Sequence, residues 1–498
     1  MKLKFFVLIF MGVLTTKSYA QSTNFKHIRG EVNFDSPIRQ WDGFGVNYVQ
    51  TAQTLDLEKD FQDYGGFSLL NEQQKSEIIE LIFGKQGLKP GLLKMFLDPW
   101  HQQTSGGVYD HETTTKQILE FATKGNDKTK ENNRELKIIT TLYGPPAYVT
   151  LQKKTRGRDL DPNHKQDLIE YYVDWVEFLA NKKNLPVKYV SLHNEGEGWR
   201  RWELDGVSHE NGNIGHDYNM YWPPEQVANF LKLIPNELKK RNLNSVKVTP
   251  GETFGWDRFY RWGYASEIAH DKEALDGLGL ITSHSFLNFG YHRWNSLHSS
   301  AGIDLLRSKK EDLHAWSTST SWAKMDSKFA WEIYSNIYMA KVNGIIPWAA
   351  IQVPDSWYGK QGDPNPGCAI WVKKDGSYHV RQGYFIYKQF TTAGQPGMNV
   401  VETMAQEQEI AIVGFGKGDT KNPDSFIVIN IDEESRNVDI AVSGTKAKSF
   451  KAVRTLDPNP EDKKLEKERY SEIGLYKVED GSVIYKAPAF SVTTFYGE

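Results

Sequence analysis

The stretch that decides the fold of this chain is residues 187–195, VKYVSLHNE. Its first six residues form a short apolar and β-branched run, which predicts a buried strand. The strand ends at His193-Asn194-Glu195. In a barrel, a carboxylate at the carboxyl end of a strand suits an acid that protonates a glycosidic oxygen, and a neighbouring amide suits a sugar hydroxyl. The segments on either side of this stretch show whether such a barrel is expected.

Short apolar strands alternate with amphipathic helices along most of the chain. The expected strands lie near residues 41–45, 92–97, 136–142, 187–192, 246–249, 278–282, 313–316 and 345–351. Between the third and fourth strands, Leu168, Tyr172 and Val176 recur at helical spacing. Eight strands that are each followed by a helix predict a (β/α)8 barrel, also called a TIM barrel, over residues 41–385.

The pattern changes after about residue 385. Residues 410–415, 425–431, 438–442 and 492–496 alternate or are β-branched, and polar turns separate them. This predicts an all-β sandwich over residues 386–498. The expected sandwich strands are few, and residues 25–34 also alternate, so we expect segment 21–40 to return and join the sandwich. The chain is therefore predicted to be an α/β barrel with a C-terminal β-sandwich.

The first twenty residues have the pattern of a signal peptide. Lys2 and Lys4 precede an apolar stretch from Phe5 to Leu14, and a small-residue cleavage site ends at Ala20. The apolar stretch is too short for a stable membrane span. We expect cleavage near Ala20 and a mature protein that is periplasmic or secreted and does not bind a membrane.

Composition excludes several other classes of protein. The net charge of −3 gives no electrostatic field for binding nucleic acid or an anionic membrane. The single cysteine, Cys368, excludes an intramolecular disulfide and a cysteine-rich metal site. The thirteen histidines form no H-E-x-x-H pattern, and no glycine-rich phosphate loop precedes a helix. We therefore expect neither a metal nor another cofactor.

Six segments, in order along the chain, resemble glycoside hydrolase family 30, whose members are retaining barrel glycosidases. The segments are Gly43-Phe44-Gly45, residues 143–148, His193-Asn194-Glu195, residues 283–286, residues 384–397 and residues 488–495. The resemblance covers nearly the whole mature chain. It implies that Glu195 is the general acid/base on the fourth strand, with Asn194 beside it and His284 on the sixth strand.

The seventh strand departs from the family. Where the family has a nucleophilic glutamate, this chain reads Trp316-Ser317-Thr318-Ser319, so the resemblance places Ser319 at that position. On the second strand, Lys94 stands where the family has an arginine that faces the nucleophile. A neutral hydroxyl offers neither the charge nor the nucleophilicity of a carboxylate to an oxocarbenium-like centre.

Three explanations of the second catalytic group stay open. Another carboxylate can act as the base of an inverting reaction, with Glu252 at the end of the fifth strand as the first candidate and Glu197 and Asp98 behind it. We then expect Glu252 to face Glu195 across a cleft; the alternative is a residue inside the barrel that is paired with Lys94 or with an arginine. The substrate can instead supply its own nucleophile. Finally, the chain can be a carbohydrate-binding relative that no longer cleaves. Elimination from a uronic acid is a more distant alternative.

Other polar and aromatic residues near the strand ends are the expected sugar contacts. Besides Glu195 and Glu252 as catalytic residues, the predicted substrate-binding residues are Asn194, His284, Trp316, Ser319, Trp348, Lys94, Tyr143, Trp199 and Arg200. Two arginines, Arg200 and Arg201, lie between tryptophans and suit a carboxylated or sulfated sugar, although an ordinary surface loop has the same composition. The sequence as a whole predicts an exported glycoside hydrolase for an oligo- or polysaccharide, with a non-catalytic carbohydrate-binding protein as the alternative.

Overall fold

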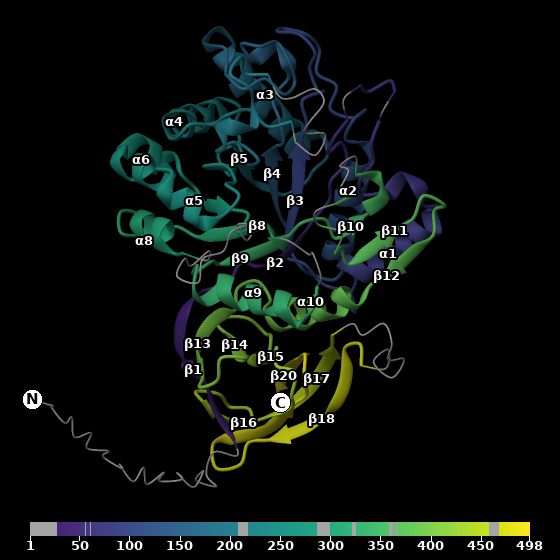
Figure 1. The fold of residues 1–498 in the computed structure, drawn as a ribbon, viewed down its shortest axis with the longest axis vertical. Helices are drawn as coiled ribbons and strands as arrows, with labels where there is room; N and C mark the ends of the chain where they lie inside the picture. Colours follow the sequence, from purple (N-terminus) through teal and green to yellow (C-terminus); the bar gives the residue numbers. More distant parts are fainter. Residues whose placement is uncertain are drawn as a thin grey trace, which may run out of the picture.

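The computed structural model describes residues 27–54, 56–59, 61–207, 218–285, 299–320, 325–357, 362–363, 365, 367–457 and 468–498. The expected signal peptide lies outside these residues. No helix in the described part of the chain is both long enough and apolar enough to cross a membrane. The chain forms a barrel domain and a β-sandwich domain, which lie one above the other in Figure 1.

Eight parallel strands form the barrel. They are β2 (Gly43–Asn47), β3 (Leu92–Leu97), β4 (Lys137–Leu142), β5 (Val187–Ser191), β6 (Lys247–Thr249), β7 (Ile281–Ser283), β8 (Ala315–Thr320) and β9 (Gly344–Pro347). Their order in the sheet is β6-β5-β4-β3-β2-β9-β8-β7. Two bridges between the segments of β6 and β7, Val248 with Leu278 and Thr253 with Ser283, close the ring. The prediction of a (β/α)8 barrel with a C-terminal β-sandwich is confirmed.

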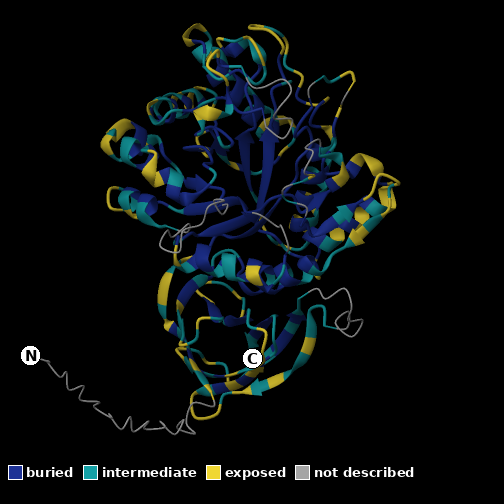
Figure 2. Cartoon of the chain, in the orientation of Figure 1, coloured by how far each residue is buried: buried dark blue, intermediate teal, exposed yellow. Residues whose placement is uncertain are grey.

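Helices surround the barrel and bury its strands. They are α1 (Glu72–Phe83), α2 (Lys116–Glu131), α3 (Lys165–Glu177), α4 (Pro224–Lys240), α5 (Trp256–Arg261), α6 (Tyr264–His270), α7 (Lys272–Gly277), α8 (Ala301–Arg307), α9 (Ser327–Tyr338) and α10 (Gln382–Ala393). Figure 2 shows buried strands inside and exposed helix faces outside. A small sheet of β10 (Ile351–Gln352), β11 (Ile370–Val372) and β12 (Tyr378–Val380) follows the last barrel strand.

The second domain is one nine-stranded sheet around its own apolar core. Its strands are β1 (Ile28–Gln40), β13 (Asn399–Ala405), β14 (Ile410–Gly416), β15 (Ser425–Asn430), β16 (Arg436–Ser443), β17 (Ser449–Leu456), β18 (Ser471–Lys477), β19 (Ser482–Ala487) and β20 (Ser491–Gly497). Strand β1 pairs antiparallel with β13 and parallel with β16. Val32 of β1 packs in the same core as Phe426 and Phe495. The N-terminal strand therefore lies within the sandwich sheet, before the barrel begins.

Helices α9 and α10 lie between the two domains (Figure 1). Helix α10 spans residue 385, where the sequence suggests the domain boundary. The Trp41 indole donates to the carbonyl oxygen of Gly394 at 3.0 Å. Asp457, at the end of β17, accepts hydrogen bonds from the backbone N–H of Ser327 at 2.6 Å and from its hydroxyl at 2.7 Å. A carboxylate of the sandwich therefore binds the first turn of a barrel helix.

We expect Asp457 to make stability depend on pH. Burial, with a smaller contribution from the carboxylate of Asp326, raises the pKa of Asp457 to about 7 despite the hydrogen bonds from Ser327. The pKa of an unfolded aspartate is about 3.9. Between these values the folded state binds more protons than the unfolded state, so the free energy of unfolding falls as pH rises from about 4 through 7.

The variant Asp457→Asn removes this titration. Denaturant unfolding should therefore show the wild type losing stability relative to the variant between about pH 5 and pH 8. Ser327→Ala is the control, because it removes one hydrogen bond but keeps the titrating carboxyl. A stability difference between wild type and Asp457→Asn that stays constant over this range would contradict the prediction.

Candidate active site at the carboxyl ends of the barrel strands

Glu195 follows β5 in a left-handed backbone conformation, with φ of 49°. Residues other than glycine seldom adopt this conformation, and where they do, the surrounding structure has to hold it. Here the N–H of Glu195 donates to the carbonyl oxygen of Glu252 at 2.7 Å, and the N–H of Glu252 donates to that of His193 at 2.8 Å. The Asn219 side chain donates to the carbonyl oxygen of Asn194 at 2.6 Å. The turn that carries Glu195 is thus fixed by the segment after β6 and by Asn219.

His193 supports this turn from the protein interior. Its ring stacks on Trp222 with the centroids 5.7 Å apart, and its Nδ1 accepts a hydrogen bond from the N–H of Gly196 at 3.1 Å. Burial lowers the pKa of His193 to about 4, so the ring is neutral near pH 7. A Cβ on Gly251, whose φ is +94°, would lie 2.2 Å from the imidazole. His193 and Gly251 therefore set the close packing of the β5 and β6 ends.

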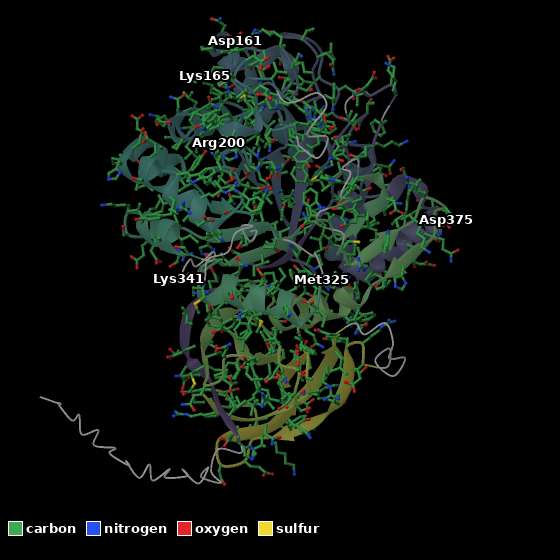
Figure 3. All side chains as sticks on the ribbon, viewed as in Figure 1. Asp161, Lys165, Arg200, Met325, Lys341 and Asp375 are labelled. Atoms are coloured by element: carbon green, nitrogen blue, oxygen red, sulfur yellow. The ribbon has the colours of Figure 1, made fainter. Side chains whose placement is uncertain are left out.

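Arg201 pairs with the Glu195 side chain. Its Nη2 donates to Oε2 of Glu195 at 2.7 Å, and the two side chains are 23% and 14% exposed. Arg201 ends the short 3-10 helix η5 (Trp199–Arg201) in the connection after β5. The predicted sugar contact Arg200, labelled in Figure 3, is exposed, with its guanidinium carbon 5.9 Å from the centre of the exposed Trp199 ring. Of the two arginines, Arg201 is therefore the one that contacts the candidate acid.

Asn194 and His284 lie together beside Glu195. Oδ1 of Asn194 is 2.9 Å from Nε2 of His284, and the same Nε2 is 3.7 Å from Oε1 of Glu195. Nδ1 of His284 donates to the carbonyl oxygen of Thr318 at 2.6 Å. Burial and the charge of Lys94 lower the pKa of His284 well below its ordinary value. The structure thus brings together three residues that the sequence singled out, from the ends of β5 and β7.

Lys94, Glu252 and Ser319 form a second cluster inside the barrel. The Lys94 ammonium is paired with Oε2 of Glu252 and donates to the Ser319 hydroxyl at 2.8 Å. The other oxygen of Glu252 accepts a hydrogen bond from the Thr141 hydroxyl at 2.8 Å. The Lys94 and Glu252 side chains are completely buried. The carboxylate of Glu252 is therefore buried in the barrel wall, paired with the Lys94 ammonium and hydrogen-bonded to the Thr141 hydroxyl.

The expectation that Glu252 faces Glu195 instead of pairing with Lys94 is wrong. The two carboxylates are not far apart, because Nδ1 of His284 lies 3.5 Å from Glu252 and Nε2 of the same ring lies 3.7 Å from Glu195. Glu252 pairs with Lys94 because it is buried, and a carboxylate removed from water needs a counter-charge. That Glu252 has a catalytic role remains a prediction.

Ser319 lies in β8 with a left-handed backbone, at φ of 63°. Its hydroxyl lies 3.4 Å from the side-chain nitrogen of Asn47, in addition to its contact with Lys94. Ser319 and Lys94 are therefore neighbours, as the two departures from the family suggested. That Ser319 stands at the position of a nucleophile remains a prediction.

The three predicted aromatic contacts in the barrel strands divide into two groups. Trp316 is fully buried, packs with Leu92 and Ile139, and donates to Asp42 at 2.8 Å, at the amino ends of the strands. The prediction that it contacts the sugar is wrong, because β8 begins at Ala315 and continues through the Ser/Thr run. Trp348 and Tyr143 follow β9 and β4, and they are 6% and 1% exposed. Both side chains are therefore almost completely buried in the wall of the barrel, at the carboxyl ends of its strands.

The two further carboxylates considered from the sequence also have structural partners. Oε1 of Glu197 accepts hydrogen bonds from the N–H of Phe254 and from Arg258, each at 2.9 Å. Asp98 accepts from the Thr51 hydroxyl at 3.0 Å and from the N–H of Trp100 at 2.9 Å. Both carboxylates therefore accept hydrogen bonds from residues in the segments that connect barrel strands to helices.

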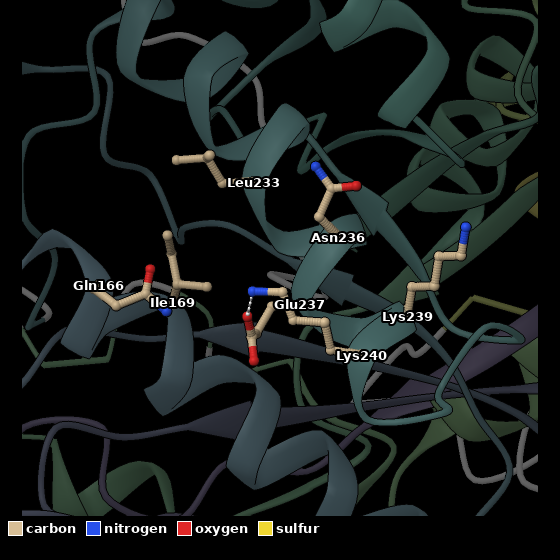
Figure 4. A pocket seen from close by; sticks show the side chains of 7 residues that line it. All are labelled: Gln166, Ile169, Leu233, Asn236, Glu237, Lys239 and Lys240. Carbon is tan, nitrogen blue, oxygen red and sulfur yellow. Dashed lines mark hydrogen bonds and ion pairs between the residues drawn. The ribbon is translucent and has the colours of Figure 1, made fainter.

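Two observations concern binding sites elsewhere in the molecule. Among the described residues, no group of three or more His, Cys, Asp or Glu side chains is arranged to hold a metal ion. A hollow of about 690 Å³ lies on the outer surface between α3 and α4 (Figure 4). It is lined by Gln166, Ile169, Leu233, Asn236, Glu237, Lys239 and Lys240. None of these belongs to the candidate site.

The sequence matches none of the protein-family models and none of the curated proteins with which it was compared. The fold, in contrast, is similar to solved structures. A GH30 endoxylanase from Clostridium papyrosolvens is 16% identical with a TM-score of 0.66, covering 94% of this chain and all of that one. An endo-β1,6-glucanase is 15% identical with a TM-score of 0.66, covering 94% of this chain and 95% of that one. A conserved exported protein from Bacteroides fragilis is 11% identical with a TM-score of 0.66, covering 94% and 99%. These similarities show a GH30-like fold.

The Lys94–Glu252 pair predicts a specific pattern of stability changes. Lys94→Met leaves a buried carboxylate without its cation and should lower the free energy of unfolding by about 3–5 kcal/mol. Adding Glu252→Gln should recover most of this loss, because the second charge leaves with the first. Denaturant unfolding measures both changes.

Lys272→Met is the matched control, since the Lys272–Asp276 pair is exposed on α7 and should contribute little. Equal losses for the two lysine variants, or no recovery in the double variant, would show that the buried pair is not the source of the effect.

Proposed function

We propose that this chain is an exported glycoside hydrolase that cleaves glycosidic bonds in an oligo- or polysaccharide, with Glu195 as the general acid/base. The observation that carries the proposal is the meeting of Glu195, Asn194 and His284 at the carboxyl ends of β5 and β7. Active sites of (β/α)8 barrels are built at this end. Export rests on the signal-peptide pattern of residues 1–20, and a protein of similar fold is described as exported.

In this proposal Glu195 gives its proton to the glycosidic oxygen as the bond breaks. The amide of Asn194 and the ring of His284 are close enough to bind hydroxyls of the same sugar. Glu252 is held by Lys94, so we favour a neighbouring group of the substrate, such as an acetamido group, as the nucleophile. Such a group would assist departure from the anomeric carbon without a second enzyme carboxylate.

We further propose that the sugar bears a carboxylate or a sulfate near the cleaved bond. Arg201 donates to Glu195, its side chain is 23% exposed, and a planar guanidinium suits such anions. Arg200 and Trp199 are exposed in the same turn and add charge and an aromatic face. An anionic sugar would therefore bind Arg201 beside the acid that protonates its glycosidic oxygen.

Carbohydrate binding without cleavage is the second candidate function. A specific observation favours it, since each of the two carboxylates beside His284 is paired with a cation, Glu195 with Arg201 and Glu252 with Lys94. Charge that is already balanced in this way does less to stabilise an oxocarbenium-like transition state.

The variant Glu195→Gln separates these two functions. It keeps the shape of the side chain but has no proton to give, so it should bind substrate and lose roughly 10²–10⁴-fold in the cleavage rate of linkages with poor leaving groups. Calorimetry and product analysis measure binding and cleavage. Glu225→Gln, an exposed change on α4, should leave both unchanged. Cleavage by Glu195→Gln at the wild-type rate would rule out the assignment, and binding without cleavage by the wild type would favour the second function.

The variant Arg201→Gln tests the charge of the substrate. We expect kcat/KM for a uronate-containing oligosaccharide to fall about ten-fold or more, while that for its neutral analogue changes much less, because a charge-assisted hydrogen bond is lost only with the former. Arg29→Gln is the control, because it removes an exposed arginine of β1 in the sandwich, outside the proposed site. Equal losses on the two substrates would mean that Arg201 acts only through Glu195.

A further inference from the structure

A stack of side chains from the connections that follow β5 and β6 lies beside the candidate site. We call it the Arg258 stack; it consists of Phe254, Arg258, Trp262 and Glu197. The guanidinium carbon of Arg258 is 4.5 Å from the centre of the Phe254 ring and 4.8 Å from that of Trp262. Both distances fall within the range of cation–π contacts. Arg258 therefore lies against two aromatic rings.

The Arg258 stack is tied to the segment that carries the candidate acid. Nη1 of Arg258 donates to Oε1 of Glu197 at 2.9 Å, and the same oxygen accepts from the N–H of Phe254 at 2.9 Å. The Glu197 side chain is completely buried and follows Glu195 by two residues. A single carboxylate oxygen thus joins the connections after β5 and β6, and the stack has a fixed position relative to Glu195.

Trp262 is held firmly and is still exposed. It caps the C-terminus of α5, where its N–H donates to the carbonyl oxygen of Arg258 at 3.0 Å. The next residue, Gly263, has a left-handed backbone with φ of +90° and begins the turn into α6. Nevertheless, 41% of Trp262 remains accessible. An exposed aromatic ring is ordinary by itself, but this one is fixed by its backbone and by an arginine whose charge Glu197 balances.

We propose that Trp262 is a sugar-stacking subsite outside the cleaved bond, where its exposed ring packs against the apolar C–H face of a pyranose unit of the substrate. The Arg258 stack keeps the ring in place, so little side-chain freedom is lost when the sugar binds. The proposal rests on the proposed function only for its substrate class, carbohydrate. It does not depend on cleavage.

The test compares binding of long and short ligands in Glu195→Gln, which removes cleavage. Trp262→Ala in this background should weaken the retention of the protein in gels of soluble xylan, carboxymethyl cellulose or polygalacturonate by about ten-fold. Trp262→Phe should restore part of it, because an aromatic face returns. Binding of a monosaccharide glycoside, which is too short to reach beyond the acid, should not change.

Tyr260→Ala is the matched control, since Tyr260 is 47% exposed on the same helix but is not part of the Arg258 stack. Retention that survives Trp262→Ala, or that falls equally with Tyr260→Ala, would overturn the subsite and leave the proposed function standing. Failure of the wild type and of Glu195→Gln to be retained by any of the three polysaccharides or to bind the glycoside would overturn the proposed function and the subsite with it.

Discussion

The buried pair of Lys94 and Glu252 is the interaction on which the interior of the barrel depends. The two residues are 158 positions apart in the sequence, on β3 and directly after β6. Thr141 of β4 donates a hydrogen bond to Glu252, and Ser319 of β8 accepts one from Lys94. The backbone of Glu252 also holds the left-handed turn at Glu195. The side chain of Glu252 therefore links β3 and β4, while its backbone holds the turn at Glu195.

This constraint also sets the electrostatics of the site. Burial keeps both nearby imidazoles, His193 and His284, neutral near pH 7, because it lowers their pKa. The charged groups around these rings include the ion pairs Glu195–Arg201, Glu252–Lys94 and Glu197–Arg258. Of the two cations Arg201 and Lys94, Arg201 is the more accessible.

The sequence predicted the barrel well because each barrel strand is a short run buried on both faces, and such runs are visible without knowledge of the partner strand. His193-Asn194-Glu195 was found for the same reason. The partner of Glu252 was not predictable, since a contact across the barrel depends on rotamers and register. Trp316 was misplaced because Ser and Thr were taken to end a strand that in fact continues to Thr320. Arg201 could not be distinguished from Arg200 on the sequence, because the two are adjacent in one turn of 3-10 helix and only the structure shows which side chain faces Glu195.

The position of β1 has a consequence for how the chain folds. This strand lies between β13 and β16, so Gly30 is paired with Ala405 on one side and with Ile440 on the other. During synthesis, β1 has neither of its partner strands until about four hundred residues or more have been made. Contacts of such large sequence separation are slow to form, because a long loop has to close before they stabilise anything. The barrel lies entirely within this loop, so its own local strand–helix units can assemble first and bring the two ends of the chain together.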